Sequence, residues 1–138
     1  MSNMSNGVTP LVGRVLLSLM LLWSGIGKVT AFSYMAGYAA AKGLPAPALA
    51  IAAAAVIEIL GGFAIIFGFK TKLSAWVIFL YLIPVTFLFH NFWAVQGPDH
   101  INTMVHFMKN VSIMGGFLML AAFGAGGYSF DAASAKKA

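Results

Sequence analysis

The 138-residue chain contains no cysteine, and charged residues make up only 8% of it. Without cysteine, the chain forms no disulfide, carries out no thiol redox chemistry and holds no iron–sulfur cluster or zinc ion through thiolates. Any redox centre must therefore be bound in another way or be supplied by a partner protein. The sequence also has no phosphate-binding loop or nucleotide fingerprint, so it gives no sign of ATP, NAD or flavin binding.

Apolar residues, in contrast, are abundant: they make up 61% of the chain, and its mean hydropathy is +0.92. A soluble domain of this size could not bury so much apolar surface. Four apolar segments each have about the 20 residues that a helix needs to cross a bilayer. They are residues 8–29, 48–69, 73–92 and 103–123. We therefore predict an all-α integral membrane four-helix bundle, one domain over residues 1–138, with the lipid bilayer as its surroundings.

The connection between the first two spans is long for a bundle. Its segment 31–42 mixes aromatic and small residues and is stopped by the sequence Gly-Leu-Pro-Ala-Pro at residues 43–47. This pattern predicts a short interfacial helix that lies over the outer end of the bundle. Such a helix serves either as a lid over a site or as a plain interfacial anchor.

The formal net charge of +5 does not come from one basic patch, which argues against a nucleic-acid partner. An even number of spans places both termini on one side of the membrane. That side carries four lysines and the other carries two: Lys70, Lys72, Lys136 and Lys137 against Lys28 and Lys42. Because positive loops stay in the cytoplasm, we predict a bacterial-type inner membrane protein with both termini cytoplasmic.

Glu58 is the only charged residue of the second span, and a carboxylate at the centre of a lipid-facing helix costs about 2.5 kcal/mol or more. It should therefore face the bundle interior. The first span has one polar and small-residue face at spacings of three and four: Arg14, Ser18, Leu21, Gly25 and Lys28. At about 1.5 Å per residue, Arg14 and Glu58 have nearly equal depth. The prediction is a structural Arg14–Glu58 ion pair, with an Arg14 that snorkels to the surface or a proton or ligand role for Glu58 as alternatives.

Polar residues from three spans gather near the predicted outer end. His106, Lys109 and Asn110 share one face of the fourth span, His90 and Asn91 close the third, and Lys28 ends the first. These residues predict a pocket below the interfacial helix, with Lys28, Asn91, Lys109 and Asn110 as ligand-binding residues. Glu58, His90 and His106 are the catalytic candidates. The alternative is that these side chains meet only water and headgroups.

A His, a Lys and an Asn around a membrane cavity suit the oxygens of a quinone ring, with His90 or His106 exchanging the accompanying proton. Haem b is a second candidate cofactor, because these two histidines could serve as axial ligands. His90, Asp99, His100 and His106 match no standard metal-ligand spacing, so no metal site is predicted.

Several short motifs, in order along nearly the whole chain, resemble the DoxX family of small four-helix membrane proteins. They are Arg14 with Trp-Ser-Gly-Ile-Gly-Lys at 23–28, Gly-Leu-Pro at 43–45, Glu-Ile-Leu-Gly-Gly at 58–62, Gly-Phe-Lys-Thr-Lys at 68–72, Phe-His-Asn-Phe-Trp at 89–93 and His-Phe-Met-Lys-Asn at 106–110. The family takes its name from a subunit linked to a quinol oxidase and to thiosulfate:quinone oxidoreductase. The resemblance therefore implies quinone-associated redox chemistry in the membrane.

Three functions follow as hypotheses. The first is a quinone-associated redox or accessory subunit of a membrane oxidoreductase, which needs a partner protein as its electron donor because this chain shows no flavin or cysteine. The second is a noncatalytic scaffold or assembly subunit of a membrane complex; the expected partner is another protein or further copies of this chain in a homo-oligomer. The third is a small transporter or proton-conducting protein that uses Glu58 and the histidines.

Overall fold

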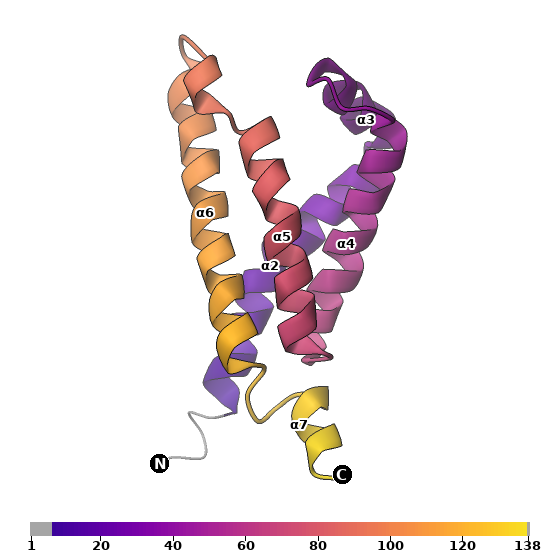
Figure 1. The fold of residues 1–138 in the computed structure, drawn as a ribbon, viewed down its shortest axis with the longest axis vertical. Coiled ribbons are helices and arrows are strands. Elements are labelled where there is room, and N and C mark those ends of the chain that lie inside the picture. The colour runs from indigo at the N-terminus through magenta and orange to yellow at the C-terminus, as the bar shows by residue number, and fades with distance from the viewer. Residues whose placement is uncertain (1–6, 138) are drawn as a thin grey trace.

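The computed structural model describes residues 7–137, and its regular elements within this range are all helices (Figure 1). Four of them are long and apolar enough to cross a membrane, which confirms the predicted all-α four-helix architecture. These are α2 (Val8–Thr30), α4 (Pro47–Phe67), α5 (Thr71–Phe89) and α6 (Asp99–Phe123). The short elements are α3 (Phe32–Ala41), the 3-10 turn η1 (Phe92–Ala94) and α7 (Phe130–Ala135).

Local sequence explains where the spanning helices begin and end. Pro47 starts α4, where its missing N–H costs nothing, and Gly68 ends that helix with a left-handed φ of 67°. Helix α6 begins at Asp99, earlier than the predicted residue 103. The negative charge of Asp99 in the first turn interacts favourably with the positive end of the helix dipole and so stabilises this earlier start. Helix α5 runs through Pro84 and stops at Phe89.

The bundle is built from two helix pairs, α2 with α4 and α5 with α6, which are joined through contacts between α4 and α5. Glycines allow the first pair to approach closely: a Cβ on Gly25 would lie 3.1 Å from the Cβ of Glu58, and one on Gly62 would lie 2.8 Å from Leu22. In Figure 1, α2 crosses behind α5, from the lower end of α6 to the upper end of α4. We call the lower end of the bundle in this view, where α7 lies, the α7 end, and the upper end, where α3 lies, the α3 end.

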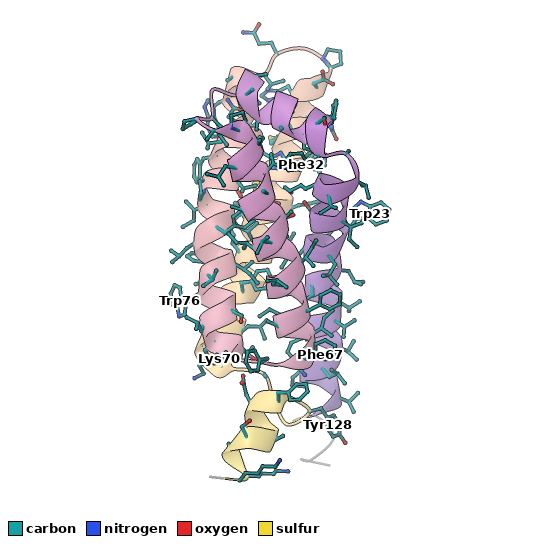
Figure 2. The ribbon with its side chains drawn as sticks, turned by 90° about the vertical axis from the view of Figure 1, so that its right-hand side faces the viewer. Trp23, Phe32, Phe67, Lys70, Trp76 and Tyr128 are labelled. Atoms are coloured by element: carbon teal, nitrogen blue, oxygen red, sulfur yellow. The ribbon has the colours of Figure 1, made fainter. Side chains whose placement is uncertain are left out.

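Apolar side chains make up most of both the core and the outer surface of the bundle, as is usual in a membrane protein. Leu21, Ile65, Ile78 and Phe117 form part of one buried core between the helices. Trp23, with 79% of its surface exposed, points away from the bundle in Figure 2. Lipid replaces water around such side chains, so their exposure carries no penalty.

Helix α3 occupies the segment predicted to form a short helix and lies over the α3 end of the bundle (Figure 1). It packs mainly on α4. It also reaches the end of α5, because the Tyr38 ring lies 5.7 Å from the Phe89 ring and Lys42 Nζ donates to Asn91 Oδ1 at 3.1 Å. The α3 segment therefore bridges the two helix pairs where they diverge.

Arg14 holds the α7 end together, and it is fully buried. Its guanidinium donates to the backbone oxygens of Ile65 at 3.2 Å and Ile66 at 3.1 Å, and to that of Tyr128. The first two belong to the last turn of α4, whose carbonyls have no partner within the helix. Arg14 thus caps α4 and fastens the segment that leads into α7.

Asp131 completes this end of the bundle. Its carboxylate accepts hydrogen bonds from the backbone N–H groups of Lys70 and Thr71, both at 2.8 Å, and so caps the start of α5. Partial burial alone would raise the pKa of Asp131, but the N–H groups of Thr71 and Lys70 and the nearby charge of Arg14 outweigh it. The net result is an Asp131 pKa below its ordinary value.

The predicted Arg14–Glu58 ion pair is wrong. Glu58 instead pairs with Lys28, and it lies beside Gly25 rather than at the level of Arg14. The equal-depth estimate assumed that α2 and α4 are aligned at their ends. In the structure α4 is shifted toward the α3 end, so that its first turns extend past α2 and pack on α3.

Candidate functional site

The only ion pair among the described residues lies inside the bundle and joins α2 to α4. Lys28 Nζ is 2.8 Å from Glu58 Oε2 and 3.0 Å from Oε1, and it also donates to Ser24 Oγ at 2.7 Å. Glu58 is 3% exposed and Lys28 is 8% exposed. The three hydrogens of the ammonium group thus all have partners, as a buried charge requires. Lys28 belongs to the predicted interior face of the first helix, and that face is confirmed because all five of its residues are buried.

Tyr81 of α5 is a site residue that the sequence analysis missed. Its hydroxyl donates to Glu58 Oε1 at 2.7 Å, so side chains from α2 and α5 together hold the carboxylate of α4. A signal was present in the sequence, because a tyrosine in the middle of an apolar span needs a partner for its hydroxyl. Ser24, four residues before Lys28, was missed for the simpler reason that it lies outside the five-residue face.

A cavity of about 380 Å³ opens beside this network, between the two helix pairs and under α3. Its volume lies within the range of roughly 300 to 1,000 Å³ that is typical of sites for small organic ligands. Its walls are mainly apolar, with residues such as Leu21, Ile51, Leu82 and Val85. Met35 and Tyr38 of α3 also line it, so the short helix takes part in closing the α3 end.

Six of the seven residues predicted as catalytic or ligand-binding line this one cavity: Lys28, Glu58, His90, His106, Lys109 and Asn110. The seventh, Asn91, does not line it, and its side-chain oxygen accepts instead from Lys42. The reason is that α5 ends at Phe89, so the chain turns at Asn91 and its side chain points to the α3 segment.

Further polar groups of the cavity come from α6 and from His90, which directly follows α5. The rings of His90 and His106 stack with centroids 5.4 Å apart and an angle of 20° between their planes. Asn110 Nδ2 donates to Thr86 Oγ1 at 3.1 Å, which orients the amide and leaves one of its two hydrogens for another acceptor.

Like His90 and His106, whose rings make no hydrogen bond within the described residues, Lys109 has a side chain without a polar partner. It lies in the middle of α6, lines the cavity, and makes no ion pair or hydrogen bond within residues 7–137. The Lys28 and Glu58 charges cancel, so Lys109 leaves the cavity with an excess of positive charge. A ligand with electron-rich oxygens would satisfy it.

These features define a class: a four-helix integral membrane protein with a partly polar cavity between its helix pairs. The DoxX family model matches residues 9–91, and the chain belongs to the DoxX family. This confirms the family expected from the short motifs. No solved structure matches the chain.

Two relatives from Escherichia coli (strain K12) cover most of the chain. The inner membrane protein YqjF is 37% identical over 127 residues, which are 92% of this chain and 92% of the relative. The inner membrane protein YphA is 34% identical over 121 residues, 88% of this chain and 86% of the relative. A Drosophila melanogaster Surfeit locus protein 4 homolog is 34% identical over 70 residues, only 26% of its length. Together with the four spanning helices, the first two support a multi-pass inner membrane protein.

Proposed function

We propose that this DoxX protein binds a quinone in its cavity and works as a quinone-associated accessory or redox subunit of a membrane oxidoreductase. The observation that carries the proposal is the ammonium group of Lys109, which lines a partly polar cavity in the middle of α6 and has no ion pair or hydrogen bond within the described residues. Intramembrane ionisable residues are costly unless they serve a ligand, a proton or a structural partner. Within the described residues Lys109 has no structural partner.

The chemistry of a quinone fits the two kinds of cavity wall. Its flat ring is apolar and suits Leu82, Ile51 and the other apolar residues, whereas its carbonyl oxygens accept hydrogen bonds. Lys109 and the remaining N–H of Asn110 are donors on adjacent positions of α6 and face the same cavity. A quinone oxygen bound there would replace the partner that Lys109 lacks.

Reduction of a quinone to a quinol takes up two electrons and two protons. This chain has no cysteine to hold an iron–sulfur cluster, so we propose that a partner protein with its own redox centre delivers the electrons. His90 and His106 line the cavity and are the proposed groups for proton exchange with the ring oxygens. Glu58, with its hydrogen bond from Tyr81, lines the same cavity and is the proposed continuation of the proton path.

The stacked arrangement of His90 and His106 favours this proton role over haem binding. Two axial histidines must each direct a ring nitrogen at an iron atom that lies between them. The two rings instead lie face to face, one on α6 and the other on the residue that follows α5. Haem is therefore left out of the proposal.

We further propose that both termini face the cytoplasm and that residues 1–138 act as one DoxX-like domain. Lys28 is consumed by its ion pair, which leaves Lys42 as the loop lysine at the α3 end. Four lysines lie in the turn after α4 or in the C-terminal segment: Lys70, Lys72, Lys136 and Lys137. The comparison is therefore four lysines against one rather than four against two, and it agrees with the retention of positively charged segments in the cytoplasm.

The test is purification from native membranes in a mild detergent, followed by mass spectrometry of bound small molecules and proteins. We expect a quinone and a redox partner to copurify, and added quinone to bind the isolated protein. Asn110→Ala should weaken that binding. Asn102→Ala is the matched control, because Asn102 is exposed on the same helix and does not line the cavity.

The other outcomes point to the other two functions. A redox partner that copurifies while no quinone binds would favour a scaffold subunit. A protein that binds neither partner nor quinone, and that carries protons or solutes when placed in liposomes, would favour transport. Either result would overturn the quinone proposal.

A further inference from the structure

A second hollow adjoins the cavity on the outer face of the bundle. It is a groove of about 510 Å³ between α2 and α6, and the residues that line it include Met20, Met104, Met108, Lys109, Ser112 and Ile113. Three of these also line the cavity: Met20, Lys109 and Ile113. The cavity and the groove therefore share one wall, and this wall lies on the lipid-facing side of the bundle.

The course of α2 explains why a groove forms at this level. Near the α7 end α2 and α6 are close, since a Cβ on Gly116 would lie 3.0 Å from Leu17 Cδ1. Toward the α3 end α2 moves away from α6 and joins α4 (Figure 1). Side chains must then span a widening gap, and the ones that do so here are mainly unbranched: Met20, Met104, Met108 and Lys109. Such side chains adapt to irregular gaps and change rotamer readily.

We propose that this groove is the lateral access route from the bilayer to the cavity and that it holds the alkyl or isoprenoid chain of the bound quinone. The inference rests on the proposed function and names the substrate class more closely, as a quinone with a long chain. The ring would lie in the cavity against Lys109 and Asn110, and the chain would leave past Met20 and Ile113. Lys109 suits this position because it is exposed and lines both hollows, and a lysine combines an apolar stem, which suits the groove, with a charged end, which suits a ring oxygen in the cavity.

The apolar character of the groove supports a chain rather than a second polar group. The thioether and branched side chains around it offer van der Waals contact, which is the main source of affinity between apolar groups inside a bilayer. Its only charged lining residue is Lys109, at the border with the cavity. A ring with no chain would leave the groove to lipid.

The experiment compares a decyl-substituted benzoquinone with the same benzoquinone ring that lacks the chain. Both are titrated into the full chain in one detergent. The affinity of each variant for each quinone is divided by that of the wild type, so that the partitioning of the quinone into detergent cancels. Met108→Trp fills the groove without touching the cavity, because Met108 lines only the groove. Val111→Trp is the control, since Val111 is exposed on α6 and lines neither hollow.

We expect Met108→Trp to weaken binding of the decyl quinone about tenfold and to leave binding of the chain-free ring within about twofold of wild type. Val111→Trp should leave both affinities within the same limit. Met104→Trp is a second groove variant and should behave as Met108→Trp does. Binding of the chain-free ring serves at the same time as the check that a variant is folded.

Two results would overturn the inference, and they are distinguishable. If wild type binds both quinones but Met108→Trp and Met104→Trp change neither affinity, or change both equally, the groove does not hold the chain while the proposed function survives. If wild type binds neither quinone, the proposed function falls and the groove proposal falls with it.

Discussion

Lys28 of α2 and Glu58 of α4 are 30 positions apart in the chain, yet Lys28 Nζ lies 2.8 Å from Glu58 Oε2 in the interior of the bundle. Gly25, one turn before Lys28, allows α4 to come close enough for this contact. The pair neutralises two buried charges, and Tyr81 adds a hydrogen bond from a third helix. The positive charge that remains at the cavity is that of Lys109, which is where the proposed ligand binds.

Removing one member of the ion pair should destabilise the protein more than removing both. Glu58→Leu leaves the Lys28 ammonium buried without a counterion, and we expect a loss of about 3–5 kcal/mol in the free energy of unfolding. The double variant Lys28→Met with Glu58→Leu should regain most of that loss. Unfolding in mixed detergent micelles measures both. If the loss in the double variant equalled the sum of the losses in the two single variants, the result would contradict a direct interaction between the two residues.

Tyr81→Phe removes only the hydroxyl that donates to Glu58 Oε1. A hydrogen bond to a charged group contributes about 1.5–3 kcal/mol, so we expect a loss of that order in the free energy of unfolding. Tyr34→Phe is the matched control, because Tyr34 is 75% exposed and does not line the cavity. The account of Tyr81 would be wrong if both variants unfolded like wild type.

Arg14 should not be replaceable by lysine. Arg14→Lys keeps the charge but cannot reach the oxygens of Ile65, Ile66 and Tyr128 with one planar group. We expect Arg14→Lys and Arg14→Leu both to lose roughly 3 kcal/mol or more, because buried carbonyls are left without donors. Thermal unfolding of the purified variants measures this. A fully stable Arg14→Lys protein would show that charge alone is what matters.

The Asp131 cap predicts a pH dependence with a definite sign. Its pKa in the folded protein is below the ordinary value of 3.8, so its contribution to stability is complete above that value and is lost as the pH falls through the folded-state pKa. We expect Asp131→Asn to be less stable than wild type by about 1 kcal/mol, a usual value for a side-chain cap. The difference should be constant from neutral pH to about pH 5 and shrink below the ordinary value. A difference that grew on acidification would contradict the assignment.

Lys109→Ala should weaken quinone binding without a loss of stability. The ammonium has no partner within residues 7–137, so its removal breaks no hydrogen bond or ion pair of the protein, whereas a charged hydrogen bond to the ligand is lost. We expect binding to weaken about tenfold to a hundredfold. Lys72→Ala, on the exposed part of α5, is the control. Unchanged quinone affinity in Lys109→Ala would remove Lys109 from the site.

Much of the fold follows from the sequence because membrane helices carry a strong signal. The lengths of the apolar runs predicted the four spans, and the spacing of Arg14, Ser18, Leu21, Gly25 and Lys28 predicted the interior face of α2. The polar wall of the cavity was also predictable. Lys109 and Asn110 follow His106 by about one helical turn, so the three side chains share one face of α6. This spacing depends on the helix alone and not on how the neighbouring helices pack.

The register between helices was not predictable, and the main error came from it. Which residue faces Glu58 depends on how far α4 slides along α2, and that shift is set by contacts with Gly25, Gly62 and α3 rather than by helix length. Tyr81 and Asn91 depend on the same kind of information. The rotation of α5 about its axis decides that Tyr81 faces Glu58. Asn91 does not line the cavity because α5 stops at Phe89 and the Asn91 side chain instead contacts Lys42.

Photoaffinity labelling with an azido-substituted quinone tests the central claim most directly. The reagent is bound to the purified protein, photolysed, and the labelled residues are located by mass spectrometry, with and without excess unlabelled quinone. The account predicts competed labels on cavity residues, above all in the α6 segment from His106 to Ile113. Labels spread over the lipid-facing surface, or labels that excess quinone does not displace, would contradict it.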